Sequence, residues 1–369
     1  MEETGGVIDP FSDANEVLLN PRMPEETARA LRARLVAAEV LQGHVFLLTS
    51  GSTAASEADF KWVALSKAAI LASARAANET LESDARDVWF HTLPEFHVGG
   101  LGIEVRATLS RSRVVRPTYE RWDPVRFAAE VAGATLTSLV PTQVHDLVGA
   151  GLRAPASLRA ILVGGGALSE GLYDAARGLG WPVLASYGLS ETASQAATDP
   201  LEGPHRLRVL PHIEMATDAE GRLRVRGASL LTGYVLDGPR LVDPKDKDGW
   251  FTTEDHGAVE DGWLTITGRV QDRIKIGGEL SNLGLLRKAF DEAAGGVRVG
   301  YALFALPDER LGHVVALAVE EDDPALDAAL AAYDARVLPF ERIRAVRQVE
   351  IPRTELGKVR WAELVRLVQ

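Results

Sequence analysis

Residues 160–169 read Ala-Ile-Leu-Val-Gly-Gly-Gly-Ala-Leu-Ser, and this short stretch contains the pattern that decides the fold. The apolar run Ala160–Val163 is typical of a buried strand. Ser169 is a residue type that commonly caps the N-terminus of a helix. A strand, a glycine-rich loop and a helix in this order indicate a sheet covered by helices, provided that the pattern repeats along the chain.

The pattern does repeat on both sides of this stretch. Helix starts are predicted at Ser66, at Asp123-Pro124 and after Pro141, where a capping residue or a proline precedes a helical pattern. The first of these helices is expected to run to Glu82. The other apolar runs that predict strands in this part of the chain are Val45–Leu48, Val88–Leu93, Arg113–Arg116, Leu136–Val140 and Val183–Ser186.

After about Leu207, short predicted strands joined by turns replace the alternation of strands and helices. Short strands are predicted at Leu223–Arg226, Thr232–Leu236 and Trp263–Thr267, and they indicate a small β subdomain. A further segment follows Gly268 and ends in a basic, amphipathic tail. The turn pairs that favour hairpins in this region are Glu220-Gly221, Asp237-Gly238 and Asp261-Gly262.

Composition limits the classes of function that are open to the chain. It has 369 residues, which is typical of two or three domains. The 52 acidic and 40 basic residues give a net charge of −12, which argues against nucleic-acid and anionic-membrane partners. The absence of cysteine excludes disulfides and thiolate metal sites. No apolar stretch approaches the length of a membrane span, and the first residues lack the pattern of a signal peptide, so a cytoplasmic location is expected.

Two hydroxyl-rich motifs directly follow predicted strands. The first is Thr49-Ser50-Gly51-Ser52-Thr53, whose small side chains and backbone N–H groups suit a polyphosphate. The second is Ser186-Tyr187-Gly188-Leu189-Ser190-Glu191-Thr192. There Tyr187 offers a ring for a base, Glu191 offers oxygen ligands for Mg²⁺, and Thr192 offers a donor for a phosphoryl oxygen. Each motif alone is also compatible with an ordinary loop or helix start.

Three charged residues further along the chain complete a candidate nucleotide site. Asp255 offers only acceptors and suits a ribose diol, whereas Arg269 offers only donors. Read individually, these two residues also fit a turn with a surface ion pair. Lys358 follows Thr354 and Gly357 in a loop that could reach into a cleft, although such a lysine is more often simply solvated.

Taken in this order, the motifs resemble those of the adenylate-forming (ANL) superfamily, which comprises acyl-CoA synthetases, carrier-loading adenylation domains and luciferases. The resemblance extends from Val45 to Trp361. Within the superfamily the chain is most similar to the o-succinylbenzoate–CoA ligases of menaquinone biosynthesis. This narrower resemblance rests on the segments Leu93–Leu101, Leu139–Gln143, Gly164–Leu168 and Gly188–Gln195.

The resemblance implies a fold, a reaction and a domain division. The expected fold is α/β, with a large N-terminal domain of helix-covered sheets, a small β subdomain and a mobile α+β C-terminal domain. The expected division is residues 1–268 for ATP and acyl binding and residues 269–369 for the C-terminal lid. The expected reaction joins a small carboxylate to AMP at the expense of ATP and Mg²⁺ and then transfers the acyl group to CoA.

The resemblance also assigns roles to individual residues. Lys358 would bridge the carboxylate and the α-phosphate, Thr192 would touch that phosphate, and Glu191 would hold Mg²⁺. His97 would lie in the acyl pocket, although it could instead cap a helix. The nucleotide and CoA would be held by Thr49, Ser50, Gly51, Ser52, Thr53, Gly165, Gly166, Ala167, Ser186, Tyr187, Gly188, Asp255, Arg269, Gly277 and Gly278. Gly164 and Gly188 would also border the acyl substrate.

Several departures from the family pattern leave alternatives open. Ala54 and the late Lys61 replace the usual glycine and lysine after the hydroxyl run, Glu254 stands where relatives have glycine, and Gln271 occupies the expected hinge. The region before Thr49 is shorter than in relatives, so either a minimal ligase works without it or a homodimer partner supplies the missing wall. Besides CoA ligation, two hypotheses remain open. The chain could load an acyl group onto a carrier protein, or it could be a non-catalytic remnant that only binds a nucleotide.

Overall fold

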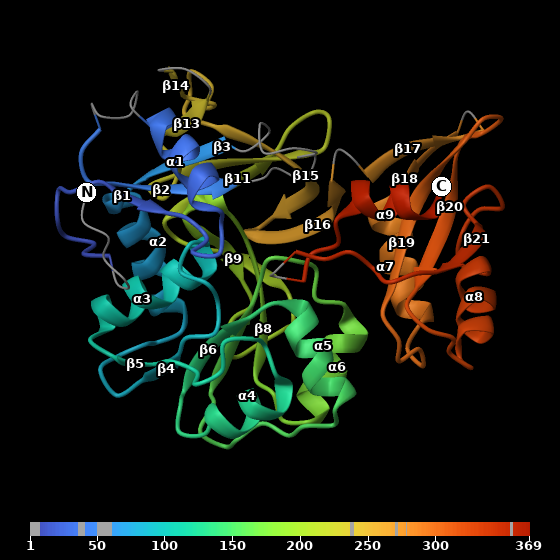
Figure 1. Cartoon of the computed structure of the whole chain (residues 1–369), viewed down its shortest axis with the longest axis horizontal. Coiled ribbons are helices and arrows are strands. Elements are labelled where there is room, and N and C mark those ends of the chain that lie inside the picture. Colours follow the sequence, from blue (N-terminus) through green and yellow to red (C-terminus); the bar gives the residue numbers. More distant parts are fainter. Residues whose placement is uncertain are drawn as a thin grey trace.

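The computed structural model describes residues 8–35, 41–49, 61–236, 240–269, 272–277, 279–354 and 357–369. Within these ranges the chain forms three sheets, and helices cover the faces of the largest one (Figure 1). The predicted mixed α/β class is confirmed. Among the described residues, no helix combines the length and the apolar character that crossing a bilayer requires.

The largest sheet joins a parallel half to an antiparallel half. The parallel half pairs β5 (Arg113–Val115), β4 (Val88–Phe90), β6 (Leu136–Leu139), β7 (Ala160–Val163) and β8 (Val183–Leu189). β8 then pairs in antiparallel fashion with β9 (Ser194–Thr198). The antiparallel half continues through β10 (Leu207–Val209), β16 (Trp263–Arg269), β15 (Phe251–Glu260), β12 (Arg222–Gly227) and β11 (Ile213–Thr217).

The helices between these strands begin where the sequence predicted. Ser66 and Ser169 cap α2 (Lys67–Thr80) and α6 (Glu170–Gly178) through their hydroxyls, and Asp123 caps α4 (Pro124–Glu130). α5 (Pro141–Gly149) has proline in its first turn. The remaining helix of this region, α3 (Val98–Ser110), packs against α2.

A second sheet lies beside the first. Its strand order is β1 (Glu16–Leu18), β2 (His44–Thr49), β3 (Lys61–Ser66), β13 (Gly233–Leu236) and β14 (Arg240–Val242). The short helix α1 (Glu25–Ala33) lies between β1 and β2 in the chain. A buried lysine, Lys67, ties the N-terminal segment to α2, because its ammonium donates to the Asp9 carbonyl, the Ser12 hydroxyl and Glu16, each at 2.7 Å.

The third sheet forms to one side of the other two (Figure 1). It contains β17 (Arg273–Ile276), β18 (Glu279–Asn282), β19 (Tyr301–Asp308), β20 (Gly312–Val319) and β21 (Ile343–Gln348). The helices α7 (Leu283–Ala293), α8 (Leu326–Asp334) and α9 (Trp361–Val368) belong to this part of the chain, which has its own apolar core around Phe290 and Leu317. The division at 268/269 falls at the end of β16 and stays a prediction.

Some predicted boundaries are wrong for identifiable reasons. β4 ends at Phe90 rather than Leu93, because residues 91–97 turn toward α3. α2 ends at Thr80 rather than Glu82, whose positive φ of 49° is incompatible with a continuing helix. The turns at Glu220-Gly221 and Asp261-Gly262 do join antiparallel strands, as predicted. Asp237-Gly238 lies outside the described residues.

A partly buried ion pair joins the residues that precede β4 and β7 in the parallel half of the large sheet. Both oxygens of Asp87 accept from Arg159, at 2.9 and 2.7 Å, and Oδ1 also accepts from Thr135 at 2.7 Å. Burial by itself would raise the pKa of Asp87, but these hydrogen bonds outweigh it and lower the pKa to about 2. The ionised carboxylate therefore stabilises the folded state.

We expect Asp87→Asn to lower the free energy of unfolding at pH 7 by about 2–4 kcal/mol, because it leaves the Arg159 guanidinium without its counter-charge. In the parent protein the lowered pKa contributes roughly 2 kcal/mol above the unfolded-state pKa, and this contribution is lost as the pH falls from about 4 to 2. Urea unfolding followed at several pH values measures both effects. Glu214→Gln, which removes an exposed ion pair, is the control. If both variants lost the same unfolding free energy between pH 4 and pH 2, the assignment to Asp87 would be contradicted.

Candidate functional site

Segments that are far apart in the sequence meet where the large sheet changes from parallel to antiparallel pairing. The loop 164–167 follows β7, and the turn 190–192 follows β8, which pairs with β7. A Cβ built on Gly165 would lie 3.7 Å from Cε of Lys358. Open α/β sheets bind ligands outside the carboxyl ends of their parallel strands. The predicted residues of loop 164–167, β8 and Lys358 therefore share one site.

The acid predicted for the ribose is held between two partners. Asp255 and Arg269 are opposite each other on β15 and β16, and Arg269 Nε lies 3.0 Å from Asp255 Oδ1. The hydroxyl of Tyr187 donates to Asp255 Oδ2 at 2.8 Å. Asp255 is only 5 % exposed, whereas the Arg269 side chain is about half exposed, and both residues lie on paired strands rather than in the turn that was the alternative interpretation. Each carboxylate oxygen keeps a further lone pair for a ligand hydroxyl.

Tyr187 has a second role besides the predicted contact with adenine. Only 8 % of the residue is exposed, and its ring packs among buried apolar residues. Burial, and then the negative charge of Asp255, raise the pKa of the Tyr187 phenol, so it remains a donor. Stacking on adenine stays a prediction, and the structure adds that Tyr187 orients Asp255.

The predicted Mg²⁺ ligand, Glu191, receives a hydrogen bond from the second sheet. Tyr234 on β13 donates to Glu191 Oε1 at 2.8 Å, and the ammonium of Lys61 lies 5.5 Å from the centre of the Tyr234 ring. Lys61 and Glu191 thus both contact Tyr234, so Lys61 is placed to interact with the terminal phosphates of a nucleotide whose Mg²⁺ is held by Glu191. A carboxylate has lone pairs beyond the one that Tyr234 uses, so Glu191 fits a hard cation. The sequence analysis missed Tyr234, since nothing marks it apart from its place in a strand.

The structure gives Thr192 a role besides the one predicted. Its hydroxyl is fully buried, donates toward the carbonyls of Leu189 and Ser194 at 3.1 and 3.0 Å, and accepts from the Leu189 N–H. Its single proton is shared between two carbonyls inside the turn, and its contact with the α-phosphate stays a prediction. Ser190, which opens the same turn and is half-buried, is the better candidate for the α-phosphate.

The predicted glycine wall is accessible. Gly165, Gly166 and Ala167 are exposed, and Gly165 has a positive φ of 80°. Gly188 cannot be replaced without moving the backbone, because a Cβ there would lie 1.6 Å from the Ser194 carbonyl oxygen. Gly164 and Ser186 are neighbours, because a Cβ on Gly164 would lie 3.6 Å from the Ser186 carbonyl oxygen.

Lys358 lies on a tight hairpin that docks against the N-terminal part of the chain. The Thr354 N–H donates to the Lys358 carbonyl at 2.8 Å, and a Cβ on Gly357 would lie 2.1 Å from Thr142 Oγ1 on α5. Lys358 is exposed as a residue, yet its ammonium end is crowded by protein atoms. Burial and nearby Arg269 lower its pKa, against the opposing effects of Asp255 and Glu191. Bound phosphates would favour the charged form.

His97 stands at the N-cap position of α3, but its side chain makes no capping hydrogen bond. The alternative role as a helix cap is therefore not what the structure supports. Its ring lies 4.6 Å from the Phe96 ring, centre to centre. A role in the acyl pocket stays a prediction.

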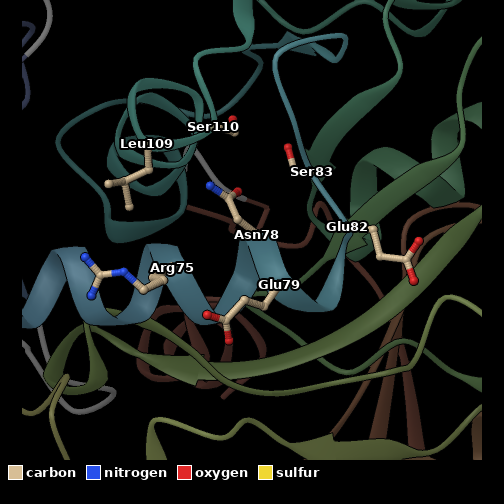
Figure 2. Close-up of a pocket in the computed structure, with 7 residues that line it drawn as sticks. All are labelled: Arg75, Asn78, Glu79, Glu82, Ser83, Leu109 and Ser110. Atoms are coloured by element: carbon tan, nitrogen blue, oxygen red, sulfur yellow. The ribbon is translucent and has the colours of Figure 1, made fainter.

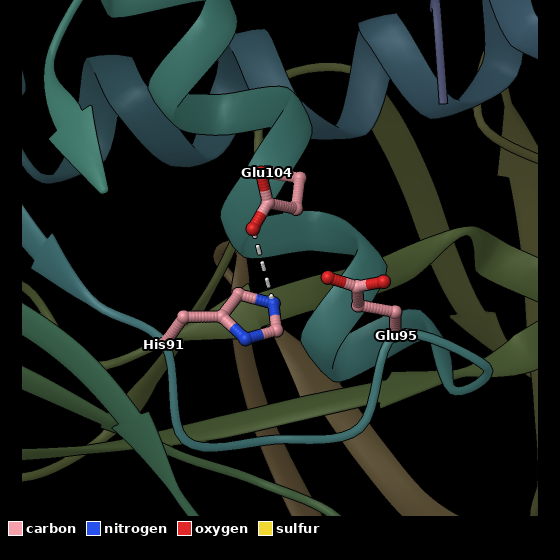
Figure 3. A group of neighbouring side chains, drawn as sticks. All are labelled: His91, Glu95 and Glu104. Carbon is pink, nitrogen blue, oxygen red and sulfur yellow. Dashed lines mark ion pairs between the residues drawn. The ribbon is translucent and has the colours of Figure 1, made fainter. Parts of the chain in front are cut away.

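A group of potential metal ligands lies close to His97 in the sequence. Figure 3 shows His91, Glu95 and Glu104, whose ligand atoms all lie within 4.8 Å of one another. Arg116 pairs with both carboxylates at 2.7 Å, so a guanidinium already supplies the positive charge there. Burial raises the pKa of Glu104 and lowers that of His91, which further disfavours a highly charged cluster. The group is better understood as an ion-pair network than as a metal centre.

A hollow of about 320 Å³ lies between α2 and the end of α3, outside the candidate site (Figure 2). Arg75 and Glu79 on α2 and Ser110 on α3 are among its lining residues. It contains none of the predicted site residues.

Part of the prediction lies outside the described residues. This applies to Ser50, Gly51, Ser52 and Thr53, to Gly278 and Gln271, and to the side chain of Thr49. The backbone of Thr49 ends β2, one residue beyond the predicted end of this strand at Leu48. Gly277 lies in the exposed turn after β17 with a φ of 60°.

The contrast between Ser190 and Thr192 can be tested by mutation. We expect Ser190→Ala to slow ATP–pyrophosphate exchange about 10- to 100-fold with unchanged stability, because one donor to the phosphate is lost. Thr192→Val should instead lower the free energy of unfolding by about 1–3 kcal/mol, because it leaves buried backbone groups unpaired. Exchange assays and chemical denaturation of both variants measure the two effects, and the reverse pattern would refute the reassignment.

Comparisons with known proteins agree with this geometry. A family model described as AMP-binding enzyme matches residues 42–235. A probable 2-succinylbenzoate–CoA ligase of Mycobacterium tuberculosis is 35 % identical, over 86 % of this chain and 82 % of the relative. An indoleacetate–CoA ligase of Aromatoleum aromaticum is 31 % identical, over 87 % of this chain and 66 % of the relative.

Solved structures show the same fold. A variant of E. coli MenE with bound OSB-AMS gives a TM-score of 0.79 at 23 % identity, covering 99 % of this chain and 89 % of that one. ATP-bound MatB from Rhodopseudomonas palustris gives 0.75 at 23 % identity, covering 88 % and 67 %. With a matching family model and a 35 % identical relative, the chain belongs to the family of AMP-binding, adenylate-forming enzymes.

Proposed function

We propose that this protein is an ATP-dependent, AMP-forming CoA ligase that activates 2-succinylbenzoate, the substrate named for several of its relatives. The observation that carries the proposal is the meeting of Asp255, Arg269, Glu191 and Lys358 around one site. In this proposal Asp255 and Arg269 hold the ribose, and Glu191 holds Mg²⁺ on the phosphates. Mg²⁺ supplies charge neutralisation at the phosphates when bound. Contact of CoA with Gly277 and Gly278 stays a prediction, as does a cytoplasmic homodimer.

Lys358 is proposed to join the two anionic reactants. The carboxylate must approach the α-phosphate, and negative charge builds up at phosphorus during the attack. A cation about 4 Å away stabilises such charge by roughly 4 kcal/mol at an effective dielectric constant near 20. The position of Lys358 supports this role, because its Cε lies 3.7 Å from where a Cβ on Gly165 would be, and Asp255 and Glu191 act on its ammonium.

A buried arginine supports a substrate with two carboxylates. Arg106 on α3 is 2 % exposed, and its Nη2 donates to Ser194 Oγ at 3.1 Å while its Nε has no hydrogen-bond partner in the described part of the chain. Burial lowers its pKa to about 10, which still leaves it charged at neutral pH. A buried charge without a counter-ion is costly, so this guanidinium suits an anionic group. 2-Succinylbenzoate has a second carboxylate that could supply one, next to the Gly188–Ser194 turn.

Lys358→Ala tests the proposed reaction directly. We expect ATP–pyrophosphate exchange to fall on the order of 10³-fold, because about 4 kcal/mol of transition-state stabilisation is lost. Thioester formation from a supplied acyl-adenylate and CoA should be largely retained. Equal loss in both half-reactions would contradict the role of Lys358. Exchange with no acid in a panel would indicate a non-catalytic remnant, and transfer to a carrier protein but not to CoA would favour carrier loading.

Arg106→Gln tests the substrate. We expect the KM for 2-succinylbenzoate to rise about 10- to 100-fold, while the KM for ATP stays constant. Arg106→Lys, which keeps the charge, should show a smaller effect. The comparison compounds are two analogues that each lack one carboxylate, and the one that is still activated should be insensitive to Arg106→Gln. Equal losses with this analogue and with the dicarboxylate would argue against the contact.

A further inference from the structure

The helix α7 contacts residues next to both Arg269 and Lys358, the two cationic residues of the proposed site. At its start, α7 touches the end of β16, since a Cβ on Gly284 would lie 2.7 Å from the Gly268 Cα. Gly268 directly precedes Arg269, the proposed ribose ligand. One turn into the same helix, Arg287 lies against Trp361, with 4.0 Å between the guanidinium carbon and the centre of the ring. Trp361 opens α9, three residues after Lys358.

Arg287 also links these two contacts through a hydrogen-bonded acid. Its Nη1 pairs with Asp272 Oδ1 at 2.5 Å, and the other oxygen, Oδ2, accepts the backbone N–H of Arg269 at 2.9 Å. A third bond, from Arg287 Nε to the Leu303 carbonyl at 2.9 Å, holds the guanidinium on β19. The planar fork of arginine is needed for this arrangement, because one face stacks on an indole while its edge donates in two directions.

We propose that Arg287 is a positioning residue for adenylation: it holds the Lys358 hairpin and the backbone of Arg269 in one fixed relation. The proposal rests on the proposed function for its kinetic consequences. Arg287 acts through Lys358 and reaches no reactant itself. A displacement of about 1 Å at a reacting group can reduce a rate by about 10²-fold, so loss of this link should affect the step that uses Lys358.

The kinetic test separates the two half-reactions. We expect Arg287→Met to slow ATP–pyrophosphate exchange about 10- to 100-fold, with thioester formation from a supplied acyl-adenylate changed by less than about threefold. Arg287→Lys keeps the charge toward Asp272 but loses the planar fork, and it should restore only part of the exchange rate. Arg336→Ala is the matched control, because this exposed arginine of the same region pairs only with Glu292 among the described contacts.

A double-mutant cycle decides whether Arg287 acts through Lys358. If it does, Arg287→Met should cause little further loss of exchange in a Lys358→Ala background. Multiplicative losses, or equal losses in both half-reactions with a lowered melting temperature, would overturn the proposal and indicate a purely structural role.

A structural readout keeps the test independent of activity. The chain has no cysteine, so Arg153→Cys and Arg360→Cys can carry two spin labels at exposed positions without background. We expect a narrow distance distribution in the parent and a broader or shifted one with Arg287→Met, but not with Arg336→Ala. An unchanged distribution would refute the link even if no acid were activated, whereas absence of activation with a changed distribution would count against the proposed function alone.

Discussion

The carboxylate of Asp255 is the point on which the site depends. It forms an ion pair with Arg269 on the neighbouring antiparallel strand and accepts a hydrogen bond from the Tyr187 hydroxyl on the last parallel strand. These two contacts join both halves of the large sheet at the place where strand direction changes. A buried carboxylate needs such donors, because its desolvation is otherwise unfavourable. The geometry of the nucleotide candidates is therefore coupled to the packing of the sheet.

In the proposed reaction, the Lys358 ammonium supplies the positive charge that faces the substrate carboxylate and the α-phosphate. Its pKa is lowered by burial and by Arg269, while Asp255 and Glu191 act in the opposite direction. Two cations this close are unfavourable in the absence of an anion, and polyphosphate would relieve their repulsion. Arg106 differs, because it is a buried guanidinium beside the Trp89 ring for which the described residues supply no carboxylate partner. In the proposed reaction, a phosphate would meet Lys358 and a substrate carboxylate would meet Arg106.

Local sequence signals predicted much of the fold. Ser66, Asp123 and Ser169 cap helices because a hydroxyl or carboxylate before a helical pattern satisfies free N–H groups. The strand at Ala160–Val163 has the predicted bounds, since a short apolar run in an α/β pattern leaves few alternatives. The hydrogen bonds of the Thr192 hydroxyl could not be predicted, because spacing along the chain does not tell which way a hydroxyl points in a tight turn. Tyr234 and Arg106 were missed because their roles come from contacts with residues distant in sequence.

The sequence by itself determined the order of the elements, the family and the set of residue types that a nucleotide and an acyl group require. These are local properties, carried by apolar periodicity, capping residues and motifs with fixed spacing. Only the tertiary structure decided which of those side chains are available and what holds them. It buried the Thr192 hydroxyl, placed Tyr234 on Glu191, and set Arg287 between Asp272 and Trp361. The physical reason is that burial and hydrogen-bond partners depend on contacts between strands and helices that the linear order of residues does not specify.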